Sequence, residues 1–234
     1  MMNEEVLTGL LHGDLPKGKL VLLYGRGGTD KTNLAILCAV NHAEKGFKVL
    51  YIDADGSFSR VRLDHTIIKY PEAVSRIFLA KPWDFEAQGK LIRNIELYTA
   101  KNVGLLVFES INFLYRWSLE GPSNITFKRN RELNLQLGIL SNLVRERNIT
   151  ILLTSQVRSR LDTGKIEPVA SRLLKQWCDV VIALAPDEMK GETTATLEKP
   201  KHDGEQPQTI FKWLKYRLWL TSDEESAAEN SRNL

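Results

Sequence analysis

This sequence has few cysteines, no long apolar run and a small net charge. Only two of its 234 residues are cysteines, and Cys38 and Cys178 both lie inside apolar segments, so neither a disulfide framework nor a cysteine-rich metal site is expected. No apolar stretch reaches the roughly 18 residues that a membrane-spanning helix needs. Glu4 and Glu5 interrupt the first ten residues, which therefore do not resemble a signal peptide. These absences predict a cytoplasmic protein with no membrane partner.

The charge is close to balanced, and no linker divides the chain. A net charge of +3 gives no whole-protein field that favours nucleic acid, so any DNA binding must come from local clusters. The length suits one α/β domain, which we expect to occupy residues 1–220. Residues 221–234 are acidic and poor in apolar side chains, which predicts a disordered tail.

Hydrophobic periodicity predicts strands and helices that alternate along the chain. Apolar runs predict strands at residues 20–24, 49–52, 76–80, 102–109, 149–154 and 180–184. Helical patterns cover residues 31–45, 59–69, 85–101, 124–147 and 172–177. We expect irregular loops at residues 117–123 and 157–168, and an antiparallel edge within residues 193–220. The strand–helix–strand order predicts an α/β fold with a mostly parallel sheet.

A glycine-rich turn follows the first predicted strand. It fits the phosphate-binding pattern G-x-x-x-x-G-K-[ST], except that Asp30 replaces the second glycine. In this pattern backbone N–H groups and a helix N-terminus surround phosphate oxygens. Lys31 would reach the β- and γ-phosphates of ATP, and the Thr32 hydroxyl would ligate Mg²⁺. The candidate nucleotide-binding residues are Gly25, Arg26, Gly27, Gly28, Thr29, Asp30, Lys31, Thr32 and Asn33.

Asp30 works against phosphate binding. At about 5 Å and an effective dielectric of about 20, each phosphate charge would repel its carboxylate by roughly 3 kcal/mol. Arg26, Mg²⁺ or protonation could offset part of this repulsion. A turn that only connects a strand to a helix is the alternative, and it leaves Lys31 and Thr32 at the helix start unexplained.

Polar side chains follow three of the predicted parallel strands. Ligands of such sheets bind beyond the carboxyl ends of the strands. Glu109 is a candidate metal ligand together with Thr32, and Asp55 could orient or deprotonate an attacking water. Gln156 could sense a γ-phosphate. The alternative reading is that Asp53, Asp55 and Glu109 follow strands only because loops are polar.

The ordered motifs resemble those of archaeal RecA-type recombinases, most of all the short RadB paralogs. The similar segments are LPKGKLVLLYGRGGTDKTNLA, KVLYIDADGSFSRVRL, NVGLLVFES and RERNITILLTSQV, within a likeness that spans roughly residues 7–220. The resemblance implies a RecA-type P-loop core, with helices flanking the sheet, an antiparallel C-terminal edge and no N-terminal DNA-binding domain. It also implies an ATP- and Mg²⁺-binding accessory protein of DNA repair and homologous recombination.

The resemblance also implies roles for single residues. Asp55 stands where the family has a catalytic Glu, Glu109 replaces the Walker B Asp, and Gln156 matches the switch Gln. Lys199 and Lys201 resemble a basic pair that reaches a neighbouring subunit's nucleotide. With Asp30, the two acid substitutions imply slow ATP hydrolysis at most.

Two segments match the DNA-contacting loops of the family, at residues 115–131 and 157–168. Basic and aromatic residues together suit single-stranded DNA. Whether Tyr115, Trp117 and Phe127 stack on bases or pack in the core stays open. The candidate DNA-binding residues are Arg116, Lys128, Arg129, Arg131, Arg158 and Arg160.

The implied partners are single-stranded DNA and a recombinase or recombinase paralog, in a homo- or hetero-oligomer. A pseudo-ATPase adaptor that needs no nucleotide is one alternative, which the substituted site residues favour. A second alternative is a partition ATPase of the ParA/MinD type, because Arg26-Gly27-Gly28 resembles the Lys-Gly-Gly of that group.

Overall fold

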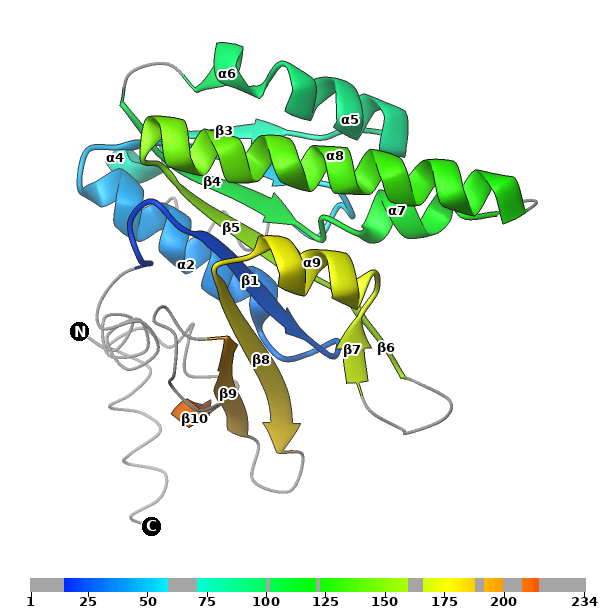
Figure 1. Cartoon of the computed structure of the whole chain (residues 1–234). Coiled ribbons are helices and arrows are strands. Elements are labelled where there is room, and N and C mark those ends of the chain that lie inside the picture. The colour runs from blue at the N-terminus through cyan, green and yellow to red at the C-terminus, as the bar shows by residue number, and fades with distance from the viewer. Residues whose placement is uncertain are drawn as a thin grey trace.

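One sheet carries the fold, with strands in the order β10-β9-β8-β1-β5-β4-β2-β3 (Figure 1). The computed structural model describes residues 15–58, 71–99, 102–120, 123–159, 166–187, 192–199 and 208–214. The strands of this sheet are β1 (Leu20–Gly25), β2 (Lys48–Asp53), β3 (Ile77–Ala80), β4 (Val103–Glu109), β5 (Thr150–Ser155), β8 (Val180–Asp187), β9 (Glu192–Lys199) and β10 (Gln208–Leu214).

The sheet is parallel from β8 to β3 and antiparallel at its C-terminal edge. Strand β1 pairs in parallel with β5 and β8, and β4 pairs in parallel with β2 and β5. Strand β9 runs antiparallel to both β8 and β10. The predicted fold class, including the antiparallel edge, is confirmed.

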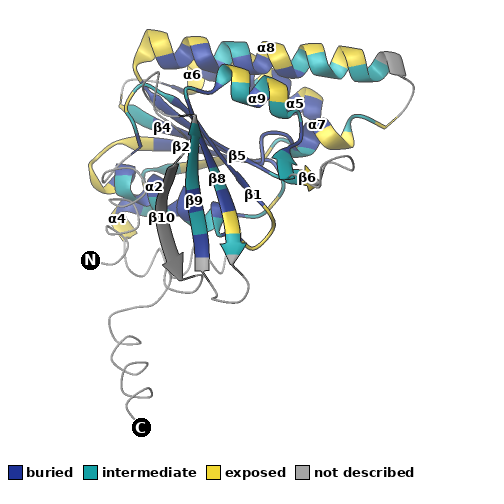
Figure 2. Cartoon of the chain, turned by 60° about the horizontal axis from the view of Figure 1, so that its bottom comes forward, coloured by how far each residue is buried: buried dark blue, intermediate teal, exposed yellow. Residues whose placement is uncertain are grey.

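Helices cover both faces of the sheet. Helices α2 (Lys31–Glu44) and α4 (Pro71–Val74) pack on one face, and α5 (Phe85–Arg93), α6 (Ile95–Tyr98), α7 (Phe113–Trp117), α8 (Ser123–Arg147) and α9 (Ser171–Trp177) pack on the other. Strands β1 and β5 are buried along their whole length (Figure 2). Their apolar runs show no polar alternation because both sides face a helical layer.

The predicted irregular loop at residues 117–123 is confirmed at residues 118–120 but not at its two ends, and the other predicted loop contains two strands. Residue Trp117 ends the short helix α7 and does not open an irregular loop. Within the predicted loop 157–168, β6 (Val157–Ser159) pairs antiparallel with β7 (Ile166–Pro168). Strands of three residues give no periodic signal, and a five-residue helix gives only a weak one.

The helix predicted at residues 85–101 is present in part. Asp84 caps α5 by accepting a hydrogen bond from the Ala87 N–H at 2.6 Å, but the predicted helix to residue 101 breaks at Asn94. The helix expected at residues 59–69 and the acidic tail lie outside the described residues.

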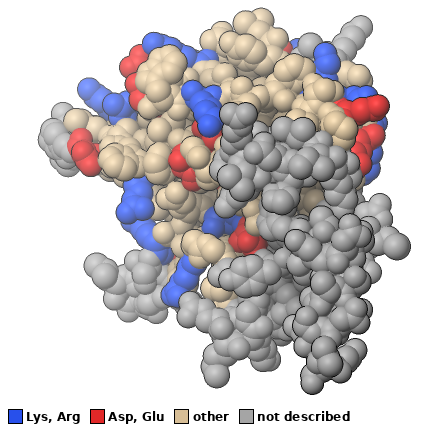
Figure 3. All heavy atoms as spheres, turned by 180° about the vertical axis from the view of Figure 1, so that it is seen from behind, with Lys and Arg blue, Asp and Glu red and all other residues tan. Residues whose placement is uncertain are grey.

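Both cysteines are buried, as expected. Among the described helices, none combines the length and the apolar character that crossing a membrane requires. Figure 3 shows basic and acidic side chains interspersed over the described surface of the rear face, in keeping with the small net charge.

Candidate nucleotide-binding site

The glycine-rich turn joins β1 to α2 with a backbone that requires two of its three glycines. A Cβ on Gly25 would lie 2.5 Å from the Leu184 carbonyl oxygen, so no larger residue fits there. Gly28 has a φ of 76°, in the left-handed region that favours glycine. Asp30, which precedes the helix, has a φ of 60° and a ψ of 21°. Asp30 therefore adopts a backbone conformation that glycine would adopt at lower cost.

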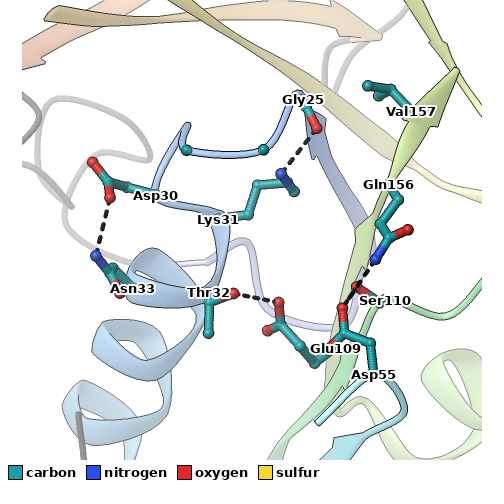
Figure 4. Close-up of a pocket in the computed structure, with 12 residues that line it drawn as sticks. Gly25, Asp30, Lys31, Thr32, Asn33, Asp55, Glu109, Ser110, Gln156 and Val157 are labelled. Atoms are coloured by element: carbon teal, nitrogen blue, oxygen red, sulfur yellow. Dashed lines mark hydrogen bonds between the residues drawn. The ribbon is translucent and has the colours of Figure 1, made fainter. Parts of the chain in front are cut away.

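The Asp30 carboxylate turns toward the start of α2. Its Oδ1 accepts a hydrogen bond from Asn33 Nδ2 at 3.0 Å. Figure 4 shows the pair on the side of the turn away from Glu109 and Asp55. Asp30 still lines the pocket, so a phosphate in the turn would lie near its negative charge.

Lys31 folds back over the turn. Its Nζ donates hydrogen bonds to the Gly25 and Arg26 carbonyl oxygens at 2.9 and 2.8 Å, and only 9% of the residue is exposed. Burial lowers the pKa of the ammonium, while the charges of Glu109, Asp55 and Asp30 act in the opposite direction. The turn therefore holds a buried cation against its own carbonyl groups.

Glu109 connects the turn to the sheet. Its Oε1 accepts a hydrogen bond from Thr32 Oγ1 at 2.8 Å, and its Oε2 accepts one from the Tyr51 hydroxyl at 2.6 Å. The residue is 1% exposed. Burial raises the pKa of Glu109, and the hydrogen bonds from Tyr51 and Thr32 oppose that shift.

Asp55 lies beside Glu109 and is held from three sides. It accepts hydrogen bonds from Ser110 Oγ, from Gln156 Nε2 at 3.2 Å and from the Ser57 N–H at 3.0 Å. The sheet thus brings together two predicted residues, Asp55 and Gln156, that lie far apart in the sequence (Figure 4).

These residues line one cavity of about 390 Å³. Arg26 and Thr29 do not line it: Arg26 is exposed, and the buried Thr29 donates a hydrogen bond to the Arg26 carbonyl at 2.9 Å. The lining residues are Gly25, Gly27, Gly28, Asp30, Lys31, Thr32, Asn33, Asp55, Glu109, Ser110, Gln156 and Val157.

The cavity suits phosphates better than a carboxylate-bound metal ion. Glycine-rich backbone and a buried lysine are groups that bind phosphate oxygens. Thr32 could donate its hydroxyl to Glu109 and still offer a lone pair to Mg²⁺. The second oxygen of Glu109, however, already faces the Tyr51 hydroxyl.

Besides Ser110 and Val157, which line the cavity, two residues that support the site were not predicted. Tyr51 lies inside an apolar strand and its sequence context indicates a core residue. The buried Asn112 donates hydrogen bonds to Ser155 Oγ and to the Gln156 and Val169 carbonyls, and accepts one from the Gln156 N–H. The position of Asn112, three residues after Glu109, is the only signal that could have suggested a role for it.

Four of the candidate DNA-binding residues lie in α7 or near the start of α8. Arg116, Lys128 and Arg131 are exposed, as is Arg158 in β6. The Arg129 guanidinium lies over the Phe85 ring at 5.9 Å. Arg160 and Lys201 lie outside the described residues, and Lys199 is the last residue of β9, opposite Val181 of β8.

The aromatic residues of this region divide into two kinds. Tyr115 is buried and donates a hydrogen bond to Asn130 Oδ1 at 2.5 Å. Trp117 and Phe127 are 64% and 72% exposed. The core therefore takes up Tyr115 and leaves the other two rings at the surface.

Comparison with known proteins agrees with this architecture. The sequence model of the Rad51 family matches residues 3–184. The "DNA repair and recombination protein RadB" of Methanococcus maripaludis is 34% identical over 91% of this chain and 97% of its own length. The protein of the same name from Methanobrevibacter smithii is 30% identical over 88% of this chain and 89% of its own length.

A solved structure is also similar. The crystal structure of the RadB recombinase superimposes with a TM-score of 0.69 and 28% identity, over 91% of this chain and 93% of that one. These matches leave no support for the partition-ATPase alternative. The chain belongs to the Rad51 family, within its RadB branch.

Proposed function

We propose that this protein is a DNA repair and recombination accessory protein that binds ATP and hydrolyses it slowly at most. The observation that carries the proposal is the convergence of Lys31, Thr32, Asp55, Glu109 and Gln156 on one cavity. These residues end or follow four different strands, so the arrangement exists only in the folded sheet.

ATP would bind with its phosphates in the glycine-rich turn. Lys31 Nζ would exchange two carbonyl acceptors for phosphate oxygens, which are stronger acceptors for a cation. The N-terminus of the 14-residue helix α2 adds partial positive charge. Mg²⁺, when bound, would neutralise phosphate charge and contact Thr32.

Slow hydrolysis follows from the surroundings of Asp55. A general base must accept a proton from the attacking water, and this carboxylate already accepts hydrogen bonds from Ser110, Gln156 and the Ser57 N–H, at three of its roughly four lone-pair sites. Asp is also shorter by a methylene than the Glu usual at this position in the family. Both features favour nucleotide binding over turnover.

The relatives' name, and the exposed basic and aromatic residues near α7, support single-stranded DNA and a recombinase as partners. A pseudo-ATPase adaptor is the second candidate. Asp30 in the turn and the engagement of Glu109 by Tyr51 favour it, because both weaken a standard nucleotide site.

Titration of a fluorescent ATP analogue separates the two candidates. We expect saturable binding to the unaltered protein and a loss of at least about tenfold in affinity in Lys31→Ala, because a charge-assisted contact is removed. Lys90→Ala, which removes an exposed lysine paired with Glu86 on α5, is the matched control and should bind normally. Equal, weak signals from all three proteins would support the adaptor.

A further inference from the structure

Tyr51 presents its hydroxyl to the site from inside the sheet. The residue is fully buried in β2, opposite Val107 of β4. The Phe58 ring packs against the Tyr51 ring with centroids 4.5 Å apart. The hydroxyl therefore has little freedom to leave Glu109 Oε2, 2.6 Å away.

The Glu109 carboxylate is held at both ends. Thr32 engages Oε1 on the turn side, and Tyr51 engages Oε2 on the core side. Carboxylates that help to hold Mg²⁺ in nucleotide sites usually do so through water. Here the oxygen that Thr32 leaves available points toward a buried tyrosine, and Glu109 is only 1% exposed.

The neighbouring acids Asp53 and Asp55 do not take the place of Glu109 as a metal ligand. Asp53 is paired with Lys81 at 3.2 Å, and Asp55 is held by Ser110, Gln156 and the Ser57 N–H.

We propose that Tyr51 engages the Glu109 oxygen that Thr32 does not, so that Glu109 contributes little to holding Mg²⁺ and nucleotide binds this protein with little dependence on Mg²⁺. The inference rests on the proposed nucleotide binding. It adds that Lys31 and backbone N–H groups neutralise most of the phosphate charge. Tyr51 is a positioning residue, because it acts through Glu109.

The test compares the affinity for a fluorescent ATP analogue in excess Mg²⁺ and in EDTA. For the unaltered protein we expect the two dissociation constants to agree within about threefold. In Tyr51→Phe the freed Glu109 can turn toward the metal, and we expect Mg²⁺ to tighten binding by at least about tenfold, the size of one hydrogen bond to a charged group.

Tyr24→Phe is the matched control. Tyr24 is also buried, in β1, and its hydroxyl also donates to a glutamate, Glu198 Oε1, at 2.6 Å. It does not line the cavity, so its loss should leave the Mg²⁺ dependence unchanged. If Tyr51→Phe fails to fold, Glu109→Asp supplies the test, because the shorter side chain cannot reach Thr32 and Tyr51 together.

The outcomes separate this inference from the function it rests on. Tight binding that requires Mg²⁺ in the unaltered protein would overturn the inference and leave the proposed function standing. An unchanged Mg²⁺ dependence in both Tyr51→Phe and Glu109→Asp would also overturn it. Absence of binding in either buffer would overturn the proposed function, and the inference with it.

Discussion

Asp30 precedes α2 with its backbone in the left-handed region, and its carboxylate accepts a hydrogen bond from Asn33. Two separate penalties meet at this residue. A left-handed backbone costs a residue other than glycine on the order of 1 kcal/mol, although Asp and Asn tolerate it better than most. A carboxylate beside bound phosphates adds repulsion.

Two substitutions separate these penalties. Asp30→Asn removes the charge but keeps the side chain, so nucleotide affinity should rise by about tenfold or more with little change in stability. Asp30→Gly should raise affinity similarly and also raise the free energy of unfolding by about 1 kcal/mol. Nucleotide titration and urea denaturation measure the two effects. Unchanged affinity in both variants would show that the carboxylate does not act on the phosphates.

The sequence pattern located the site residues but not their conformations. Lys31, Thr32, Asp55, Glu109 and Gln156 were predicted because the motif and the strand ends are local features. No sequence pattern predicts the left-handed backbone of Asp30, since Asp is common in many turns. Tyr51 was missed because a tyrosine in an apolar strand is equally typical of the core.

At the scale of elements, a line of buried amides joins α5 to α8. Gln88 and Gln136 are both fully buried, and Gln88 Nε2 donates to Gln136 Oε1 at 2.9 Å and to the Ile111 carbonyl at 3.2 Å. Gln136 donates in turn to Glu132 Oε1, which also pairs with Arg93 at 2.6 Å. Because buried amides need partners, this line fixes how the two helices pack.

Gln136→Leu should lower the free energy of unfolding by about 1–3 kcal/mol, because it leaves the Gln88 amide short of a partner. Gln88→Leu should cost a similar amount, and the double variant less than the sum, since both partners are then apolar. Urea denaturation gives these values. Gln176→Leu, on the exposed side of α9, is the control and should change stability by less than about 0.5 kcal/mol. Additive losses would contradict a direct coupling.

The elements that the sequence did not predict are the short ones. Helix α7 has five residues, and β6 and β7 have three each. Contacts between segments that are distant in the sequence position these elements. Asn112, at the N-cap of α7, forms hydrogen bonds with Ser155, Gln156 and Val169. Such contacts form only when β4 and β5 lie side by side, so the local periodicity of the sequence does not predict them.

At the scale of the whole molecule, α8 provides an internal comparison for DNA binding. Its 25 residues span about 37 Å, with Lys128 near one end and Arg145 and Arg147 at the other. Helix α7, which contains Arg116, lies beside the N-terminal part of α8 (Figure 1). Charges at the two ends of α8 can therefore be removed in equal number.

Removing both Arg116 and Lys128 should weaken binding of labelled oligo(dT) and reduce the slope of log affinity against log salt by about 1.4, or about 0.7 per lost phosphate contact. Fluorescence anisotropy over a range of KCl concentrations measures the slope. The double variant Arg145→Ala with Arg147→Ala removes the same charge and should leave the slope close to that of the unaltered protein. Equal changes in both variants would indicate an unspecific effect of net charge.

The position of β1 in the sheet has a consequence for how the chain folds. Strand β1 lies between β5 and β8, with Leu20 opposite Ile151 and Val21 opposite Val180. This strand, which leads into the glycine-rich turn, is therefore synthesised early and pairs with strands that are synthesised much later. Pairings between such distant segments fold slowly, because a long loop must close first. During synthesis at about 5–20 residues per second, the apolar β1 stays unpaired for many seconds. The nucleotide-binding turn is thus complete only after most of the chain has been translated, and a chain interrupted just before Val180 leaves one edge of β1 without its β8 partner.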